Sequence, residues 1–127
     1  MIASDIMTRK VCTIQPEASA QEVAQLLDEK RISGAPVLNA QGQLIGMITE
    51  ADIISKVNRE GLRVADIMTH ELIVVTEDTP VGEIAQLLTE RKIKRVPVVS
   101  DGKLVGIVSR ADIVHAVAQG HLIIRAW

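Results

Sequence analysis

The sequence repeats itself over almost its whole length. The tetrapeptide DIMT at 5–8 returns at 66–69, and EVAQLLDEKRI at 22–32 returns as EIAQLLTERKI at 83–93. GQLIGMITEADI at 42–53 matches GKLVGIVSRADI at 102–113. The offset is 60 residues here and 61 for the earlier pairs, because the second copy has one turn residue fewer. Shared composition would not keep these segments in one order, so we infer a duplicated unit of roughly 60 residues. A unit of that size buries too little surface to be stable alone, which predicts that the copies pack on each other across a pseudo-two-fold axis.

Each copy predicts the element order β-α-β-β-α, which is an α+β fold. Ser19 and Glu22 form a capping box before a helix with apolar residues at helical spacing. In the second copy, Thr79 is the expected cap and Pro80 the first helical residue. The expected strands are 11–14, 35–38 and 43–48 in the first copy, and 72–75, 96–99 and 103–108 in the second; the second helices begin after 49 and 109.

The repeat sets the predicted domain boundaries. The first motif is expected at 1–60 and the second at 61–119, with a polar linker at 56–64. Gly120 is expected to end the last helix. Residues 120–127 form an apolar C-terminal tail that has no counterpart in the first copy.

Composition excludes several classes of protein. The net charge is −2 and the chain has no Phe or Tyr and one Trp, so it lacks the basic patches and stacking rings of nucleic-acid binders. No apolar run reaches the roughly 18 residues that span a membrane, so no membrane span is expected. The N-terminus has no apolar signal region, and the lone Cys12 fits a reducing compartment, which together predict a cytoplasmic location.

The strongest candidate for chemistry is a GxxT/SxxD element that occurs in both copies. Gly46, Thr49 and Asp52 return as Gly106, Ser109 and Asp112, where a strand ends and a helix begins. A hydroxyl there can bind a phosphate or ribose oxygen, and a carboxylate one turn later can accept from a ribose diol. The same residues also read as an ordinary capping box, and the pattern alone leaves both interpretations open.

A second candidate is the basic group Lys92, Lys94 and Arg95 before the buried strand of the second copy. Arg95 is suited to a bidentate grip on phosphate. Cations also suit a helix C-terminus, so a purely structural role is the alternative. The first copy has Ser33 and Gly34 in place of the last two, and any phosphate clamp is therefore asymmetric.

The sequence gives little support for catalysis. His70, His115 and His121 lack the spacing of metal ligands, so no metal site is expected. Cys12 has no base near it in sequence, and no nucleophile or nucleotide-loop motif occurs. We expect that the protein is not an enzyme and needs no catalytic cofactor.

On these residues the chain resembles a tandem pair of cystathionine β-synthase (CBS) domains, a Bateman module, of the stand-alone type. The resemblance covers about 1–119 and rests on the repeated DIMT, the APV and VPV strands, and the two GxxT/SxxD elements. It implies two β-α-β-β-α CBS motifs packed through their sheets and a homodimer. It also implies a regulatory sensor whose clefts bind AMP, ADP or ATP, with S-adenosylmethionine or cyclic di-AMP as further candidates, and which signals to an effector protein of unknown identity.

The resemblance also implies the residues of two clefts, each drawn from both motifs. The Asp and hydroxyl of one motif hold ribose and phosphate, while the other motif holds the adenine, and basic residues before the buried strand reach phosphate. One cleft would consist of Met47, Thr49, Ala51, Asp52, Met68, Ile73, Ile93 and Lys94, with Arg95 nearby. The other would consist of Ile107, Ser109, Ala111, Asp112, Met7, Cys12, Ile32, Ser33 and Gly34.

The alternative function is a dimerisation module whose clefts no longer bind a ligand. The helices have more apolar surface than two small sheets can cover, and uncovered patches of that kind usually mark interfaces. The predicted dimer contact consists of Val23, Leu26, Leu27, Ile53, Ile54, Val57 and their equivalents in the second copy.

Overall fold

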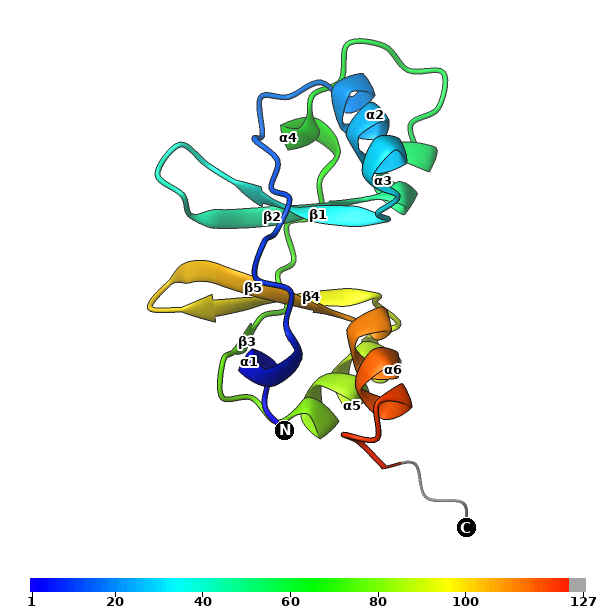
Figure 1. Cartoon of the computed structure of the whole chain (residues 1–127). Coiled ribbons are helices and arrows are strands. Elements are labelled where there is room, and N and C mark those ends of the chain that lie inside the picture. The colour runs from blue at the N-terminus through cyan, green and yellow to red at the C-terminus, as the bar shows by residue number, and fades with distance from the viewer. Residues whose placement is uncertain (124–127) are drawn as a thin grey trace. The chain divides into compact units, whose positions relative to one another are not determined.

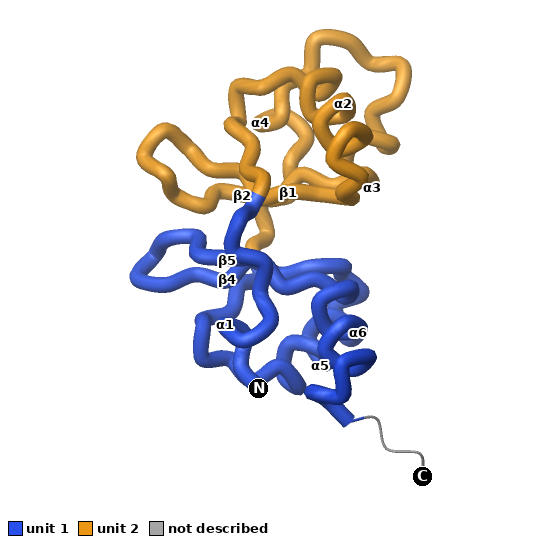
Figure 2. The backbone as a smooth tube through the Cα atoms, viewed as in Figure 1, with its two compact units in different colours: residues 1–11, 73–127 blue, residues 12–72 orange. Residues whose placement is uncertain are grey.

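The chain folds into two compact units, and the computed structural model describes residues 1–123. Unit 2 is the continuous segment Cys12–Leu72, whereas unit 1 combines Met1–Val11 with Ile73–Trp127 (Figure 2). The first eleven residues belong to the first copy by sequence but lie in the unit that the second copy builds. The boundaries of the units in space therefore differ from those of the sequence repeat.

Unit 2 is a two-stranded antiparallel sheet with helices on one face (Figure 1). β1 (Gly34–Leu38) pairs with β2 (Leu44–Thr49). The Asn39 side chain closes their turn by accepting hydrogen bonds from the backbone of Gln41 and Gln43. Ile14 adds one parallel bridge to Val37. The helices are α2 (Ala20–Lys30), α3 (Glu50–Ile54) and α4 (Val64–Ile67).

Unit 1 repeats this plan with a three-stranded sheet. β3 (Val75–Thr76) pairs in parallel with β4 (Arg95–Ser100), which pairs in antiparallel with β5 (Lys103–Ser109). Asp101 and Gly102 both have positive φ, 51° and 77°, which is the backbone of a tight hairpin turn. The helices are α1 (Ala3–Ile6), α5 (Val81–Arg91) and α6 (Arg110–Ala118).

Each unit has its own hydrophobic core, and each core takes two residues from the leading segment of the other copy, which is its first helix with the residue that follows. α1 carries Ala3 and the following Met7 into the core of unit 1, and α4 carries Val64 and Ile67 into the core of unit 2. The two copies have therefore exchanged their leading helices. The rest of each core comes from the long helix and the strands: Val75, Ile84, Leu88, Val96, Val98 and Val108 in unit 1, and Ile14, Val23, Leu27, Ala35, Val37 and Ile48 in unit 2.

The leading helices are also fixed by backbone hydrogen bonds that match between the units. In unit 1, the N–H of Ala3 donates to Thr79 O at 2.8 Å. In unit 2, the N–H of Val64 donates to Ala18 O at 2.9 Å. After each helix the DIMT threonine forms a two-way bridge with the last strand: Thr8 with Ile107, and Thr69 with Met47. The leading segments are thus part of each sheet edge as well as of each core.

Gly46 and Gly106 permit this close approach. A Cβ on Gly46 would lie 2.8 Å from the backbone oxygen of Thr69, and a Cβ on Gly106 would lie 2.7 Å from the sulfur of Met7. Real Cβ atoms essentially never come so close to another atom. The glycine of the GxxT/SxxD element is therefore needed for docking of the leading segment, whatever else the element does.

Three local predictions are wrong. Val64 is buried and begins α4, so the polar linker ends before it. Thr79 does not cap α5; its hydroxyl accepts from the Thr76 N–H at 3.0 Å, and Pro80 takes the cap position. The expected strand at 11–14 is reduced to the bridge of Ile14, and of the strand expected at 72–75 only Val75 is paired, in β3. No helix within residues 1–123 is long and apolar enough to cross a membrane.

Replacement of Ile67 by Ala should destabilise unit 2, although Ile67 belongs to the second copy by sequence. The buried side chain leaves a cavity, and we expect a loss of about 2–5 kcal/mol in the free energy of unfolding. Hydrogen exchange should show that the Val37 amide of β1 loses protection before the Val98 amide of β4. Earlier loss at Val98 would contradict the exchange of helices. Val74→Ala, at a side chain that is 42% exposed, is the control and should change stability by less than about 0.5 kcal/mol.

Replacement of Gly46 by Ala should cost about 1–3 kcal/mol in the free energy of unfolding, because the new methyl group meets a backbone oxygen. Gly106→Ala should cost a similar amount, because its Cβ would lie 2.7 and 2.9 Å from the sulfur and Cγ of Met7, which is buried in the core. Gly82→Ala is the matched control: nothing lies within 4 Å of its Cβ position, and alanine favours the helix by up to about 1 kcal/mol. Denaturant titration measures all three, and equal stability of the Gly46 and Gly82 variants would refute the docking argument.

Candidate ligand sites

Asp52 is the centre of a hydrogen-bond cluster where β2 ends and α3 begins. Its Oδ2 accepts from the Thr49 N–H at 2.9 Å and from the Thr49 hydroxyl at 3.1 Å. Its Oδ1 accepts from the hydroxyl of Thr69 at 3.0 Å. One half-buried carboxylate therefore joins the first turn of α3 to the leading segment that docks on β2.

Asp112 is the centre of the same cluster in unit 1. Its Oδ2 accepts from the Ser109 N–H at 2.8 Å and from the Ser109 hydroxyl at 3.0 Å. Its Oδ1 faces the hydroxyl of Thr8 at the longer distance of 3.4 Å. The two clusters thus agree in every partner and differ most in the length of the threonine contact.

The capping interpretation of the GxxT/SxxD element is realised in both copies. Thr49 and Ser109 are N-caps, each accepts from the N–H of the aspartate three residues later, and each aspartate accepts in return from the cap N–H. The cap uses only one oxygen of each carboxylate. The other oxygen faces the exposed threonine, so the aspartates keep capacity for a further partner.

The residues before each buried strand lie beside the cap of the same unit. In unit 2, Gly34 pairs with Thr49, and the Glu50 N–H donates to Ser33 O at 3.0 Å. In unit 1, Arg95 pairs with Ser109, and the Arg110 N–H donates to Lys94 O at 3.0 Å. The cap of unit 1 therefore has two basic neighbours along the backbone, whereas that of unit 2 has a serine and a glycine.

The structure divides each predicted cleft between the two units. Of the first set, unit 2 contains Met47, Thr49, Ala51, Asp52 and Met68, and unit 1 contains Ile73, Ile93, Lys94 and Arg95. Of the second set, unit 1 contains Ile107, Ser109, Ala111, Asp112 and Met7, and unit 2 contains Cys12, Ile32, Ser33 and Gly34. The hydroxyl, the carboxylate and the DIMT methionine thus lie in one unit in each case. That the residues of the other unit complete the same site stays a prediction.

Several residues that were predicted to contact adenine also belong to the cores. Met7 is buried in the core of unit 1, and Ile73 and Ile93 pack against it. Ile32 and Met68 pack against the core of unit 2. Substitution of any of these side chains would alter folding and binding together, so they are poor positions for testing a ligand site.

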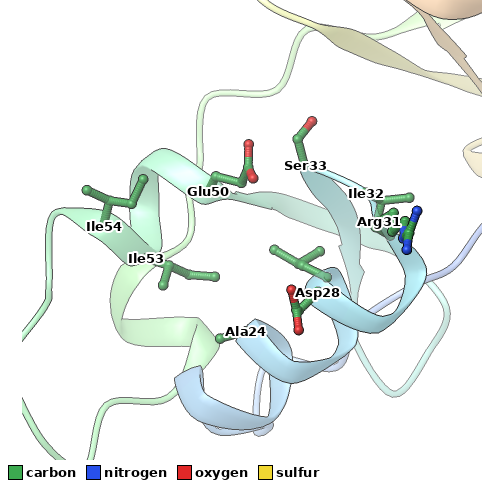
Figure 3. A pocket seen from close by; sticks show the side chains of 9 residues that line it. Ala24, Asp28, Arg31, Ile32, Ser33, Glu50, Ile53 and Ile54 are labelled. Atoms are coloured by element: carbon green, nitrogen blue, oxygen red, sulfur yellow. The ribbon is translucent and has the colours of Figure 1, made fainter.

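Unit 2 also has a pocket of about 510 Å³ between α2 and α3 (Figure 3). Its apolar wall comes from both helices, and carboxylates of Asp28 and Glu50 and the guanidinium of Arg31 surround it. Of the predicted ligand residues, Ile32 and Ser33 line this pocket, whereas Thr49 and Asp52 do not. The remaining lining residues are Ala24, Leu27, Ile53 and Ile54.

The sequence prediction omitted Thr8 and Thr69, which touch the two aspartates. The signal was present, because the repeated tetrapeptide keeps a threonine at its fourth position in both copies. Of that tetrapeptide, the predicted clefts include only the methionines, Met7 and Met68. Within residues 1–123, no group of three His, Cys, Asp or Glu side chains is placed to hold a metal ion.

Two solved structures of CBS-pair proteins resemble this chain closely. The first is the CBS domain pair of protein MJ0100 in complex with 5′-methylthioadenosine and S-adenosyl-L-methionine, with a TM-score of 0.86 and 30% identity over 94% of this chain and 98% of that one. The second is CBSX2 of Arabidopsis thaliana in complex with AMP, with a TM-score of 0.87 and 31% identity over 95% of this chain and 98% of that one. Both support the predicted α+β fold of two CBS motifs, which is confirmed.

Relatives of similar length carry the same domains. The CBS domain-containing protein YhcV of Bacillus subtilis is 33% identical over 86% of this chain and 80% of its own length. Two archaeal relatives are longer, and this chain spans 59% and 40% of their lengths. CBS-pair proteins are generally regulatory, non-catalytic modules. The chain also matches 23% of a homoserine O-acetyltransferase and 22% of an inosine-5′-monophosphate dehydrogenase, both of which are longer proteins. The CBS domain family matches residues 3–59 and 64–119, and this chain belongs to that family as a tandem CBS pair.

Proposed function

We propose that this chain is a regulatory module that binds an adenosine-containing ligand of the AMP, ADP or ATP class and signals its presence to a partner protein. The observation that carries the proposal is the pair of half-buried aspartates, Asp52 and Asp112, each with one oxygen turned away from its cap. An aspartate or glutamate in this role accepts hydrogen bonds from ribose hydroxyls in dinucleotide sites. The AMP and S-adenosyl-L-methionine complexes of similar CBS pairs support an adenosine ligand.

Phosphate recognition is assigned to Lys94 and Arg95. Lys94 is exposed and Arg95 half-buried, at the start of β4. A phosphate needs cations as well as N–H groups when it leaves water, and a guanidinium can bind two of its oxygens at once. Ser33 and Gly34 stand at the equivalent positions of unit 2, so only one of the two ligand sites should distinguish a nucleotide strongly from its nucleoside.

Replacement of Asp52 or Asp112 by Ala should weaken adenosine-ligand binding at one site each. Hydrogen bonds to a charged group contribute about 1.5–3 kcal/mol, so we expect a loss of affinity of about tenfold or more. Isothermal titration calorimetry with AMP, ATP, S-adenosylmethionine and cyclic di-AMP measures affinity and stoichiometry together. Unchanged affinity and stoichiometry in the double variant would refute the assignment.

The matched control for this experiment is Asp66→Ala. The Oδ2 of Asp66 accepts from the Arg63 N–H at 2.8 Å, just as that of Asp52 accepts from the Thr49 N–H at 2.9 Å. Both substitutions therefore remove a helix cap, but only one removes a proposed ligand contact. The melting temperature without ligand should fall in both variants, and further in the Asp52 variant, because Asp52 also accepts from the hydroxyls of Thr49 and Thr69. Affinity should fall in the Asp52 variant alone.

Replacement of both Lys94 and Arg95 by Ala should lower the affinity for AMP and ATP and leave that for adenosine nearly unchanged. Loss of the cations should also reduce the dependence of ATP binding on salt concentration. Titration of adenosine and ATP at low and high salt tests both expectations. An equal loss for the two ligands would identify the basic pair as structural. The sequence predicts that Lys94 contacts the ligand held by Asp52. In that case Asp52→Ala should also abolish the difference in affinity between ATP and adenosine.

Self-association is the second candidate function, and exposed apolar residues favour it. Ile54, the last residue of α3, is 69% exposed, and Val57, which follows the helix, is 65% exposed. Val114, the equivalent of Ile54 on α6, is 65% exposed. Ile54 also lines the pocket between α2 and α3, where charged residues surround an apolar wall as at many protein interfaces. Val23 and Leu27 are buried in the core of unit 2, and their equivalents Ile84 and Leu88 in that of unit 1, so the prediction that these four form the dimer contact is wrong.

Replacement of both Ile54 and Val114 by Asp should convert a homodimer into a monomer. Each apolar side chain buried in the dimer contact contributes about 1.5–3 kcal/mol to association. A carboxylate in its place would have to be desolvated, which opposes association. Analytical ultracentrifugation at micromolar concentration gives the mass. Val74→Asp, at another exposed apolar position of unit 1, should leave the mass unchanged. A wild-type protein that sediments as a monomer would exclude this second function.

A further inference from the structure

The oxygens of Asp52 and Asp112 are almost fully used before any ligand arrives. A carboxylate offers about four acceptor sites, two on each oxygen. Within residues 1–123, Oδ2 of Asp52 accepts two donors from Thr49, and Oδ1 accepts one from Thr69. One acceptor site remains, and the count is the same at Asp112 with Ser109 and Thr8. A ribose diol brings two hydroxyl donors. Both can donate to the same carboxylate only if one of the existing donors leaves.

The donor that leaves most easily is the threonine of the DIMT segment. The Thr49 hydroxyl is held at both ends, because it donates to Asp52 and accepts from the Asp52 N–H, and this contact is partly buried. The Thr69 contact is exposed and has one hydrogen bond to the carboxylate. The backbone bridge between Thr69 and Met47 keeps the segment in place when the hydroxyl turns away. Displacement of Thr69 thus costs one side-chain hydrogen bond and leaves the docking of the segment intact.

We infer that the DIMT threonines compete with the ligand's ribose for the two aspartates, so that ligand binding displaces Thr69 from Asp52 and Thr8 from Asp112. This inference rests on the proposed function and names how its sites are regulated. Each threonine and the aspartate that it contacts come from different copies of the repeat. A ligand on the aspartate of one copy therefore changes a contact of the leading segment of the other copy. The contact is 3.0 Å at Asp52 and 3.4 Å at Asp112, so the competition is stronger at Asp52.

Thr69→Val tests the inference because valine keeps the shape and lacks the hydroxyl. The affinity for AMP at the site of Asp52 should rise about tenfold or more, the effect of removing one competing hydrogen bond to a charged group. The affinity for 2′-deoxy-AMP should change less than about twofold, because a single hydroxyl fits the acceptor site that is already open. Thr8→Val should give a smaller gain at the site of Asp112. Calorimetry in the Asp112→Ala and Asp52→Ala backgrounds isolates each site.

Two control variants keep the result specific. Thr69→Ser retains a hydroxyl donor and should bind AMP like the wild type. Thr89→Val removes a hydroxyl that donates to Ala85 O within α5 instead of to an aspartate, and should also bind like the wild type. Melting curves without ligand establish that each variant is folded.

The outcomes separate this inference from the proposed function. If AMP binding is lost in the Asp variants but Thr69→Val lowers the affinity, leaves it unchanged, or raises it equally for AMP and 2′-deoxy-AMP, the competition is refuted and the adenosine site stands. If AMP binding is absent in the wild type or survives both Asp→Ala changes, the proposed site fails and the inference with it. A gain that is confined to AMP in Thr69→Val supports both.

Discussion

The rest of the structure depends on the docking of each leading helix into the core of the other copy. Ala3 and Met7 complete the core of unit 1, and Val64 and Ile67 complete that of unit 2. Without them each core would lack residues that are almost fully buried. A unit of about 60 residues buries so little apolar surface that this loss would destabilise it strongly. The exchange therefore makes the two copies mutually dependent for stability. It also brings residues of both copies to each GxxT/SxxD element.

The GxxT/SxxD element serves that docking at every one of its defining positions. Gly46 allows the backbone of Thr69 to approach, Thr49 caps α3, and Asp52 joins the cap to the Thr69 hydroxyl. The structural and ligand-binding interpretations therefore do not exclude each other. The same carboxylate that holds the leading segment has one acceptor site left for a ligand. Under the proposed function, a ligand bound at Asp52 changes the contact that holds the leading segment.

Much of the fold follows from the sequence because its signals are local or repeated. The long helices, the two hairpins and the duplicated plan were all predicted, since helical spacing, capping residues and turn residues specify them within a few positions. The exchange of leading helices was not, because an internal repeat does not reveal which copy a segment packs against. The same limit applies to the site: Asp52 and Asp112 stood out by pattern, whereas Thr8 and Thr69 gain their importance from contacts 104 and 17 residues away in sequence. The assignment of Val64 to a linker failed for this reason too, since its burial depends on a distant core.

The two units differ in how they are assembled from the chain, and this difference sets an order of folding during synthesis. Unit 2 is one continuous segment, so all of its parts have been made once the ribosome has passed Leu72. Unit 1 needs Met1–Val11 and strands that are translated near the end of the chain. Domains generally fold as units during synthesis. Met1–Val11 therefore leave the ribosome before any part of unit 2, but their native neighbours are made only after unit 2 is complete.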